Sequence, residues 1–138
     1  PRIEDTLCIA ALTQCIMRML WRLRTNNQRW RIYDRFLVGE NRWRAQRYGV
    51  NDGLIDFGAR EVKPFPELID ELLELIHEDA EVLNCTAEVE RAREIAAQGT
   101  SSDRQRLVFQ KTIEAGGTKE AALRAVVDSL VGEFSEGL

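Results

Sequence analysis

The sequence is 138 residues long, which is enough for one domain with its own hydrophobic core. Hydrophobic residues make up 44% of it and charged residues 30%, as in an ordinary globular protein and unlike a disordered or fibrous one. We find no continuous apolar run of 18 residues and no signal-like N-terminus, so we expect a cytoplasmic protein without a membrane partner.

The net charge of -4 is distributed unevenly along the chain. Residues 18–47 contain nine arginines and two acidic residues, which gives this block a charge of +7. Residues 61–138 contain eight basic and seventeen acidic residues, which gives a charge of -9. We therefore divide the chain into residues 1–60, with a first helix, an arginine- and aromatic-rich helix and a turn, and residues 61–138, an acidic helical tail; together they form one helical domain.

Apolar residues recur at intervals of three and four between residues 4 and 24, which predicts the first helix. Arg18, Arg22 and Arg24 gather in its last turns, where positive charge complements the helix dipole. The sequence supports a ligand-binding role for these arginines about as well as this structural role. Short polar residues over 25–28 end the helix because their side chains compete for backbone hydrogen bonds.

A second helix is predicted over residues 35–48, with Phe36, Leu37 and Trp43 as its packing contacts. Gly49 follows as the residue that permits a positive φ at the helix end. After a turn at residues 51–53, residues 54–57 read as a short extended piece. We expect no more than this one extended segment in the chain.

Four more helices are predicted in the acidic tail, each from a start signal and an apolar periodicity. Their start signals are Pro66 at the first helical position, Thr86 as an N-cap, Ser102 with Gln105 as a capping box, and Thr118 as an N-cap. The sequence as a whole therefore predicts an all-α fold with five or six helices.

The cysteines and the single histidine give no signal of a metal site. Cys8, Cys15 and Cys85 are odd in number and not closely paired, so we interpret them as small buried apolar residues. His77 has no second histidine or cysteine at ligand spacing, which favours a half-exposed helical position over a metal ligand or a general base. We therefore assign no metal ligand in this chain.

The run Glu40–Gly49, ENRWRAQRYG, interleaves three arginines with two aromatic residues. On a helix, Asn41, Arg44 and Tyr48 fall on one side, and Glu40 lies one turn before Arg44 and is placed to form an ion pair with it. Arginine forks suit planar oxyanions such as carboxylate and phosphate. The catalytic residues stay unassigned, and the candidates for anion or substrate binding are Asn41, Arg42, Arg44 and Arg47.

This run, with Asp52–Phe57 after it, resembles the C-terminal part of the bacterial carboxylate-amine ligases, the type 2 glutamate-cysteine ligase family. The resemblance extends upstream through Pro1-Arg2, residues 9–12 and residues 27–31, and more loosely downstream through the helical tail. Because it begins within the family's pattern, we expect the chain to be a C-terminal fragment of a longer enzyme.

For the complete enzyme, the resemblance implies a glutamine-synthetase-like α+β architecture, of which this chain would be the helical part. It implies an ATP-dependent ligase that phosphorylates a carboxylate, typically the γ-carboxylate of glutamate, and lets an amine such as that of cysteine displace phosphate. ATP and Mg²⁺ are the implied cofactors, with the metal carboxylates on strands outside this chain, so this chain alone is expected to bind neither. The implied partners are glutamate or another carboxylate, cysteine or another amine, and the N-terminal catalytic part of the same enzyme.

Two alternatives stay open at this point. In the first, the chain is a non-catalytic lid or dimerisation element, including a homodimer, and Trp43 and Tyr48 are core anchors beside a Glu40–Arg44 ion pair. In the second, arginines and aromatic residues bind nucleic acid. The acidic second half and the near absence of lysine in the basic block weigh against the second alternative, so we expect no nucleic-acid partner.

Overall fold

The computed structural model describes residues 2–30 and 32–135. Within these ranges the chain forms six helices and two short strands, in the order α1 (Ile3–Thr25), α2 (Arg35–Tyr48), β1 (Leu54–Asp56), β2 (Glu61–Lys63), α3 (Phe65–Leu83), α4 (Thr86–Gln98), α5 (Ser101–Glu114) and α6 (Lys119–Ser135). The predicted helical class is confirmed, and so are the first two helices to within one residue at each end.

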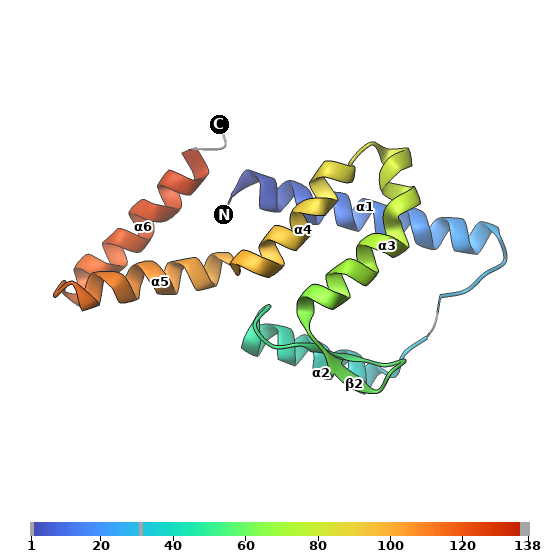
Figure 1. Ribbon diagram of the computed structural model, residues 1–138, viewed down its shortest axis with the longest axis horizontal. Coiled ribbons are helices and arrows are strands. Elements are labelled where there is room, and N and C mark those ends of the chain that lie inside the picture. Colours follow the sequence, from blue (N-terminus) through green and yellow to red (C-terminus); the bar gives the residue numbers. More distant parts are fainter. Residues whose placement is uncertain (1, 31, 136–138) are drawn as a thin grey trace.

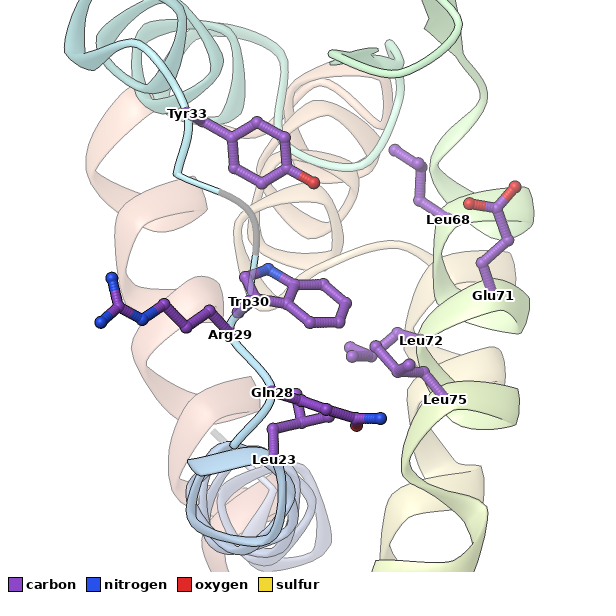
Figure 2. Close-up of a pocket in the computed structure, with 9 residues that line it drawn as sticks. All are labelled: Leu23, Gln28, Arg29, Trp30, Tyr33, Leu68, Glu71, Leu72 and Leu75. Carbon is purple, nitrogen blue, oxygen red and sulfur yellow. The ribbon is translucent and has the colours of Figure 1, made fainter. Parts of the chain in front are cut away.

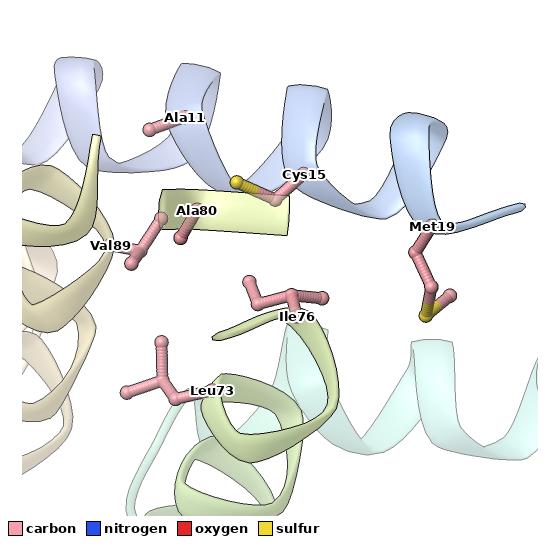
Figure 3. Packing of buried hydrophobic residues seen from close by; sticks show 7 residues of the cluster. All are labelled: Ala11, Cys15, Met19, Leu73, Ile76, Ala80 and Val89. Carbon is pink, nitrogen blue, oxygen red and sulfur yellow. The ribbon is translucent and has the colours of Figure 1, made fainter. Parts of the chain in front are cut away.

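Helices α1, α3 and α4 cross one another and form the three-helix core (Figure 1). Their apolar periodicity places one face of each helix inward, and Ile76 at the middle of α3 is fully buried. Figure 3 shows seven side chains of this cluster, namely Ala11, Cys15, Met19, Leu73, Ile76, Ala80 and Val89. The predicted burial of Cys8 and Cys15 is confirmed, and Cys85 lies half-buried at the edge of the cluster.

Asp79 is the one buried charged residue among those described, and it joins α3 to α1. Arg18 pairs with its Oδ1, and Arg22 Nη2 donates to its Oδ2 at 3.0 Å. Burial on its own raises the pKa of Asp79, but the hydrogen bonds from the two guanidinium groups outweigh burial and hold that pKa below its usual value. Arg18 and Arg22 therefore have a structural role in clamping α1 onto α3.

Helix α1 is long and apolar enough, by length and composition, to cross a membrane, with a mean hydropathy of 1.2 over its most apolar 18 residues. This finding qualifies the expectation from the sequence that no apolar stretch of that length occurs. Core helices of water-soluble proteins share this length and composition, and one face of α1 packs in the three-helix core. The hydropathy of α1 therefore gives only weak evidence for a membrane span.

Helices α5 and α6 form a helical arm that leaves α4 and folds back towards the start of α1 (Figure 1). Arg104 of α5 holds the arm closed, because its Nε donates to Glu133 Oε1 of α6 at 2.7 Å. Asp5, near the start of α1, forms two ion pairs. Its Oδ2 lies 3.5 Å from Arg104 Nη2, and its Oδ1 lies 3.1 Å from Arg91 Nη2 of α4. One carboxylate of α1 thus meets both α4 and the arm.

Strands β1 and β2 pair antiparallel, with Ile55 opposite Val62. The prediction of an extended piece at residues 54–57 is confirmed, but the prediction of only one extended segment is wrong. Strand β2 offers one apolar residue between two charged ones, too short a pattern to indicate a strand. The pairing of β2 with β1 is favoured instead by the turn between them, in which Asp56 Oδ1 accepts hydrogen bonds from the backbone nitrogens of Gly58 at 2.7 Å and Ala59 at 3.1 Å.

The predicted helix caps are partly right. Thr118 is confirmed as a cap, because its Oγ1 accepts from the Ala121 nitrogen at 3.2 Å. The capping box of α5 lies two residues earlier than predicted, at Thr100 and Asp103 instead of Ser102 and Gln105. Residue Thr86 is the first residue of α4, so the cap position belongs to Cys85, and Pro66 is the second residue of α3 and not its first.

Candidate functional site

Helix α2, which carries the arginine run, has no buried residue. It begins where Asp34 caps it, with Oδ1 accepting from the Phe36 nitrogen at 2.7 Å. It ends at Gly49, whose φ of 61° confirms the predicted positive-φ position. Because burial does not fix this helix, its position depends on polar contacts with the hairpin that follows it.

Asn41 makes two of these contacts with one residue of β1. Its Nδ2 donates to the Ile55 carbonyl at 2.9 Å, and its Oδ1 accepts from the Ile55 nitrogen at 2.7 Å. The side-chain amide thus pairs with the free backbone edge of the strand as a further strand would. Both ends of the Asn41 amide are used inside the chain.

Arg44 fixes the turn that leads into β1. Its Nε donates to the Gly53 carbonyl at 2.9 Å, and its Nη2 lies 2.9 Å from Asp52 Oδ2. The predicted ion pair between Glu40 and Arg44 is wrong, because Asp52 accepts from this guanidinium instead. The side chain of Arg44 is only 17% exposed, so it is largely committed to the fold.

Gly53 is required where this turn meets β2. A Cβ atom at Gly53 would lie 2.0 Å from the Lys63 carbonyl oxygen, closer than any side chain permits. Lys63 in turn links the hairpin to α3, with its Nζ 2.6 Å from Asp56 Oδ2 and 2.7 Å from Glu71 Oε1. The hydrogen bond that Lys63 donates to Asp56, together with those from the backbone nitrogens of Ala59 and Gly58, lowers the pKa of Asp56 to about 2.

Arg42 and Arg47 differ from the other two site candidates. Both are exposed, and neither has a hydrogen bond or an ion pair with any residue in the described ranges 2–30 and 32–135. Trp43 lies between them in sequence, is 50% exposed, and meets Tyr48 edge-to-face at a centroid distance of 5.7 Å. The structure therefore separates the four candidates into two held groups, Asn41 and Arg44, and two free cations.

The predicted packing role of the α2 aromatic residues is partly wrong. Phe36 is 78% exposed and does not pack in the core of this chain. Leu37 is half-buried, and Trp43 makes its ring contact within α2. The outer side of α2 thus presents aromatic and cationic groups together, a surface able to bind an anion or to pack against another structural unit.

A second candidate site, which sequence reasoning missed, is an open cleft of about 810 Å³ between the connector after α1 and helix α3. Figure 2 shows Trp30 and Tyr33 of the connector facing α3, while the Arg29 side chain points away. The lining residues are Leu23, Gln28, Arg29, Trp30, Tyr33, Leu68, Glu71, Leu72 and Leu75. No short motif marks this cleft, because its walls come from segments about 40 residues apart in the chain.

Residues 2–30 and 32–135 contain no group of three or more histidine, cysteine or acidic side chains arranged to hold a metal ion. His77 is exposed on α3, with Nδ1 3.7 Å from Glu81 Oε1 one turn later. The described residues can therefore supply cations and aromatic faces, and among them no cluster of metal ligands is formed.

The glutamate-cysteine ligase family 2 (GCS2) model matches residues 1–129. Relatives provisionally named glutamate-cysteine ligase 2 are 60% identical over 134 residues in Jannaschia sp., 56% over 132 in Rhodospirillum rubrum and 54% over 138 in Ruegeria pomeroyi. These alignments cover 97%, 96% and 100% of this chain but only 35%, 34% and 35% of the relatives. No solved structure matches. A match over residues 1–129 shows that the chain belongs to the glutamate-cysteine ligase family 2.

Proposed function

We propose that this chain is the C-terminal helical part of an ATP-dependent carboxylate-amine ligase that joins glutamate to cysteine. The supporting observation is the family match over residues 1–129 in a chain spanning about a third of the length of its relatives. ATP would phosphorylate the γ-carboxylate of glutamate, and the cysteine amine would displace phosphate to give γ-glutamylcysteine. Mg²⁺ would be held by carboxylates outside this chain, in a cytoplasmic enzyme.

The test compares this 138-residue chain with the complete ligase, in assays of phosphate release and γ-glutamylcysteine formation with Mg²⁺, ATP, glutamate and cysteine. We expect turnover by the complete protein and none above background by this chain alone, because the described residues hold no carboxylate cluster for the metal. Turnover by this chain alone, or no γ-glutamylcysteine from the complete protein, would contradict the proposal.

Within the ligase, we assign anion binding to Arg42 and Arg47. To Asn41 and Arg44 we assign the role of holding α2 against the hairpin. The two free cations have all their donors available, whereas Asn41 and Arg44 use theirs on the hairpin. Losing one cation aimed at a transferring phosphoryl group or a substrate carboxylate typically lowers kcat/KM by about a hundredfold.

The matched control for this assignment is Arg35→Ala, which removes an exposed arginine from the start of the same helix. Arg42→Ala and Arg47→Ala in the complete ligase should lower kcat/KM by at least about tenfold more than Arg35→Ala, with unchanged urea midpoints. Equal activities for all three variants would reduce Arg42 and Arg47 to surface charges.

The outer face of α1 supports the view that a larger body covers this chain. Ile9 is 63% exposed, Met17 66% and Trp21 66%, although the opposite face of α1 packs in the three-helix core. A helix that is apolar all round is normally buried on all sides. We infer that the rest of the ligase covers this face. If α1 inserted into a bilayer instead, the complete protein would sediment with phospholipid vesicles, which would contradict this inference.

A second candidate function is a dimerisation element, and a specific feature of α6 favours it. Leu123, Val127 and Val131 recur every four residues along the helix and are 52%, 57% and 60% exposed. Such a stripe is the pattern used in helix–helix association. Light scattering of the complete ligase and of its Val127→Glu variant would decide, because a dimer made through α6 should dissociate in the variant.

A further inference from the structure

Two thiols from distant parts of the chain meet at the edge of the three-helix core. Cys15 in α1 and Cys85 between α3 and α4 are 70 residues apart in sequence, and their Sγ atoms are 3.5 Å apart. Cys15 is fully buried and Cys85 is half-buried, so Cys85 is the thiol that solvent can reach. Cys8, the third thiol, is fully buried and also free.

The position of Cys85 is fixed by the tight turn between α3 and α4. Asn84 adopts the left-handed conformation with φ of 52°, and the Cys85 nitrogen donates to the Ala80 carbonyl at 3.0 Å. Figure 3 shows Cys15 on α1 in the cluster that also contains Ala80. Both cysteines therefore belong to ordered, neighbouring elements, and a disulfide bond of about 2 Å requires an approach of only about 1.5 Å.

We propose that Cys15 and Cys85 form an oxidative modification site, which closes to an intramolecular disulfide when the protein meets a low-molecular-weight disulfide such as cystine. This proposal does not depend on the proposed ligase activity, because it uses only thiols within this chain. It changes the interpretation of these cysteines as inert apolar residues, since burial alone does not require two of them to touch.

The chemistry is two successive thiol–disulfide exchanges. The Cys85 thiolate attacks one sulfur of cystine and releases one cysteine, which leaves a mixed disulfide on Cys85. The Cys15 thiolate then attacks the Cys85 sulfur and releases the second cysteine. Two protein thiols are oxidised, one cystine is reduced to two cysteines, and the two protons lost by the protein thiols end on those products.

The second exchange should be the slow one. Burial, followed by the hydrogen bond with Cys85, raises the pKa of Cys15 to about 12, so its thiolate is scarce at neutral pH. The product would join α1 to the turn between α3 and α4 by a covalent bond. Because the closed ring spans 70 residues, it removes many conformations from the unfolded chain, and Tm should rise by about 5 to 10 °C.

The experiment incubates the 138-residue chain with excess cystine for hours, blocks remaining thiols with an alkylating agent, and determines intact mass, linked peptides and Tm. We expect a protein lighter by two hydrogen atoms, a Cys15–Cys85 peptide, a higher Tm, and alkylation of Cys8 only after unfolding. The matched control Cys8→Ser should behave like wild type, whereas Cys85→Ser should form no cross-link.

Peptide mapping of the wild-type protein decides the matter even if a cysteine variant fails to fold. A mixed disulfide that persists on Cys85 without closing would overturn the proposal. So would linkage through Cys8, complete resistance of the wild type to cystine, or a Cys15–Cys85 bond that leaves Tm unchanged.

Discussion

The three-helix core and the α2–hairpin unit, which consists of α2, β1 and β2, are held in place by different forces. The core contains nearly all of the buried apolar residues in the described ranges, with Ile76 fully enclosed. Helix α2 buries none, and its contacts with the hairpin are hydrogen bonds from Asn41 and Arg44. Burial thus stabilises one region, whereas directional bonds orient the other.

This difference determines how firmly the arginine run is held in place. Hydrogen bonds define the geometry of the groups they join, but each adds only about 1 kcal/mol of net stability. The α2–hairpin unit therefore has a defined orientation, but moving it away from the rest of the chain should require little free energy. A surface of this kind suits a site completed by another structural unit, because the outer face of α2 stays available.

The largest effect should come from emptying the core. Ile76→Ala removes a fully buried side chain from the middle of α3 and should lower the free energy of unfolding by about 3 to 4 kcal/mol. Val82→Ala, on the same helix but 60% exposed, should cost less than about 0.5 kcal/mol. Urea unfolding followed by circular dichroism measures both. Equal losses would mean that α3 does not pack as described.

A pair of glycine substitutions separates close packing from helix propensity in the α2–hairpin unit. Gly53→Ala places Cβ against the Lys63 carbonyl and should cost about 2 to 3 kcal/mol. Gly39→Ala, inside α2 with no atom within 4 Å of the new Cβ, should stabilise the protein by about 0.5 to 1 kcal/mol. Thermal unfolding of both variants gives the two signs. A destabilised Gly39→Ala would reveal a neighbour at that position.

Two arginines on one helix should also behave differently. Arg44→Ala loses the contacts to Gly53 and Asp52 and should lower the urea unfolding free energy by about 1 to 2 kcal/mol. Arg42→Ala, which breaks no contact among the described residues, should change it by less than about 0.5 kcal/mol. The comparison fails if the two variants are equally stable.

The smallest effect concerns acid. The folded pKa of Asp56 is about 2, below its ordinary value of 3.8, so the unfolded chain binds the proton first as pH falls. The contribution of the Asp56–Lys63 pair is therefore complete above about pH 5 and lost between about pH 4 and pH 2. Asp56→Asn should have a flatter stability profile than wild type across this window. Urea midpoints at several pH values measure the slope, and parallel profiles would exclude the pair as its source.

Sequence patterns predicted the elements whose signals are local. The predicted helix over 35–48 matches α2, and the cap at Thr118 is confirmed. Both signals lie close together in sequence, so no contact between distant segments was needed to find them. The capping box of α5 was misplaced because Thr100 and Ser102 both precede a polar residue by three positions. Only the folded chain shows that Asp103 Oδ2 accepts from the Thr100 nitrogen at 2.8 Å.

Features that join distant segments were beyond prediction. Nothing near Asp79 in sequence marks it as buried, since its partners Arg18 and Arg22 lie about 60 residues earlier. Within the arginine run, spacing on an ideal helix suggested Glu40 as the partner of Arg44. The competing acceptor, Asp52, becomes available only when the chain turns back at Gly53.

The long-range ion pairs of α1 bear on the order of folding during synthesis. Within this chain α1 is synthesised before its ion-pair partners, because Asp79 follows Arg18 by 61 residues and Arg91 follows Asp5 by 86. At about 5 to 20 residues per second, α1 would wait several seconds or longer before its partners emerge. During that interval the face of α1 that packs against α3 and α4 has no partner from this chain, so a nascent chain halted shortly after α1 should be prone to capture by chaperones or to aggregation.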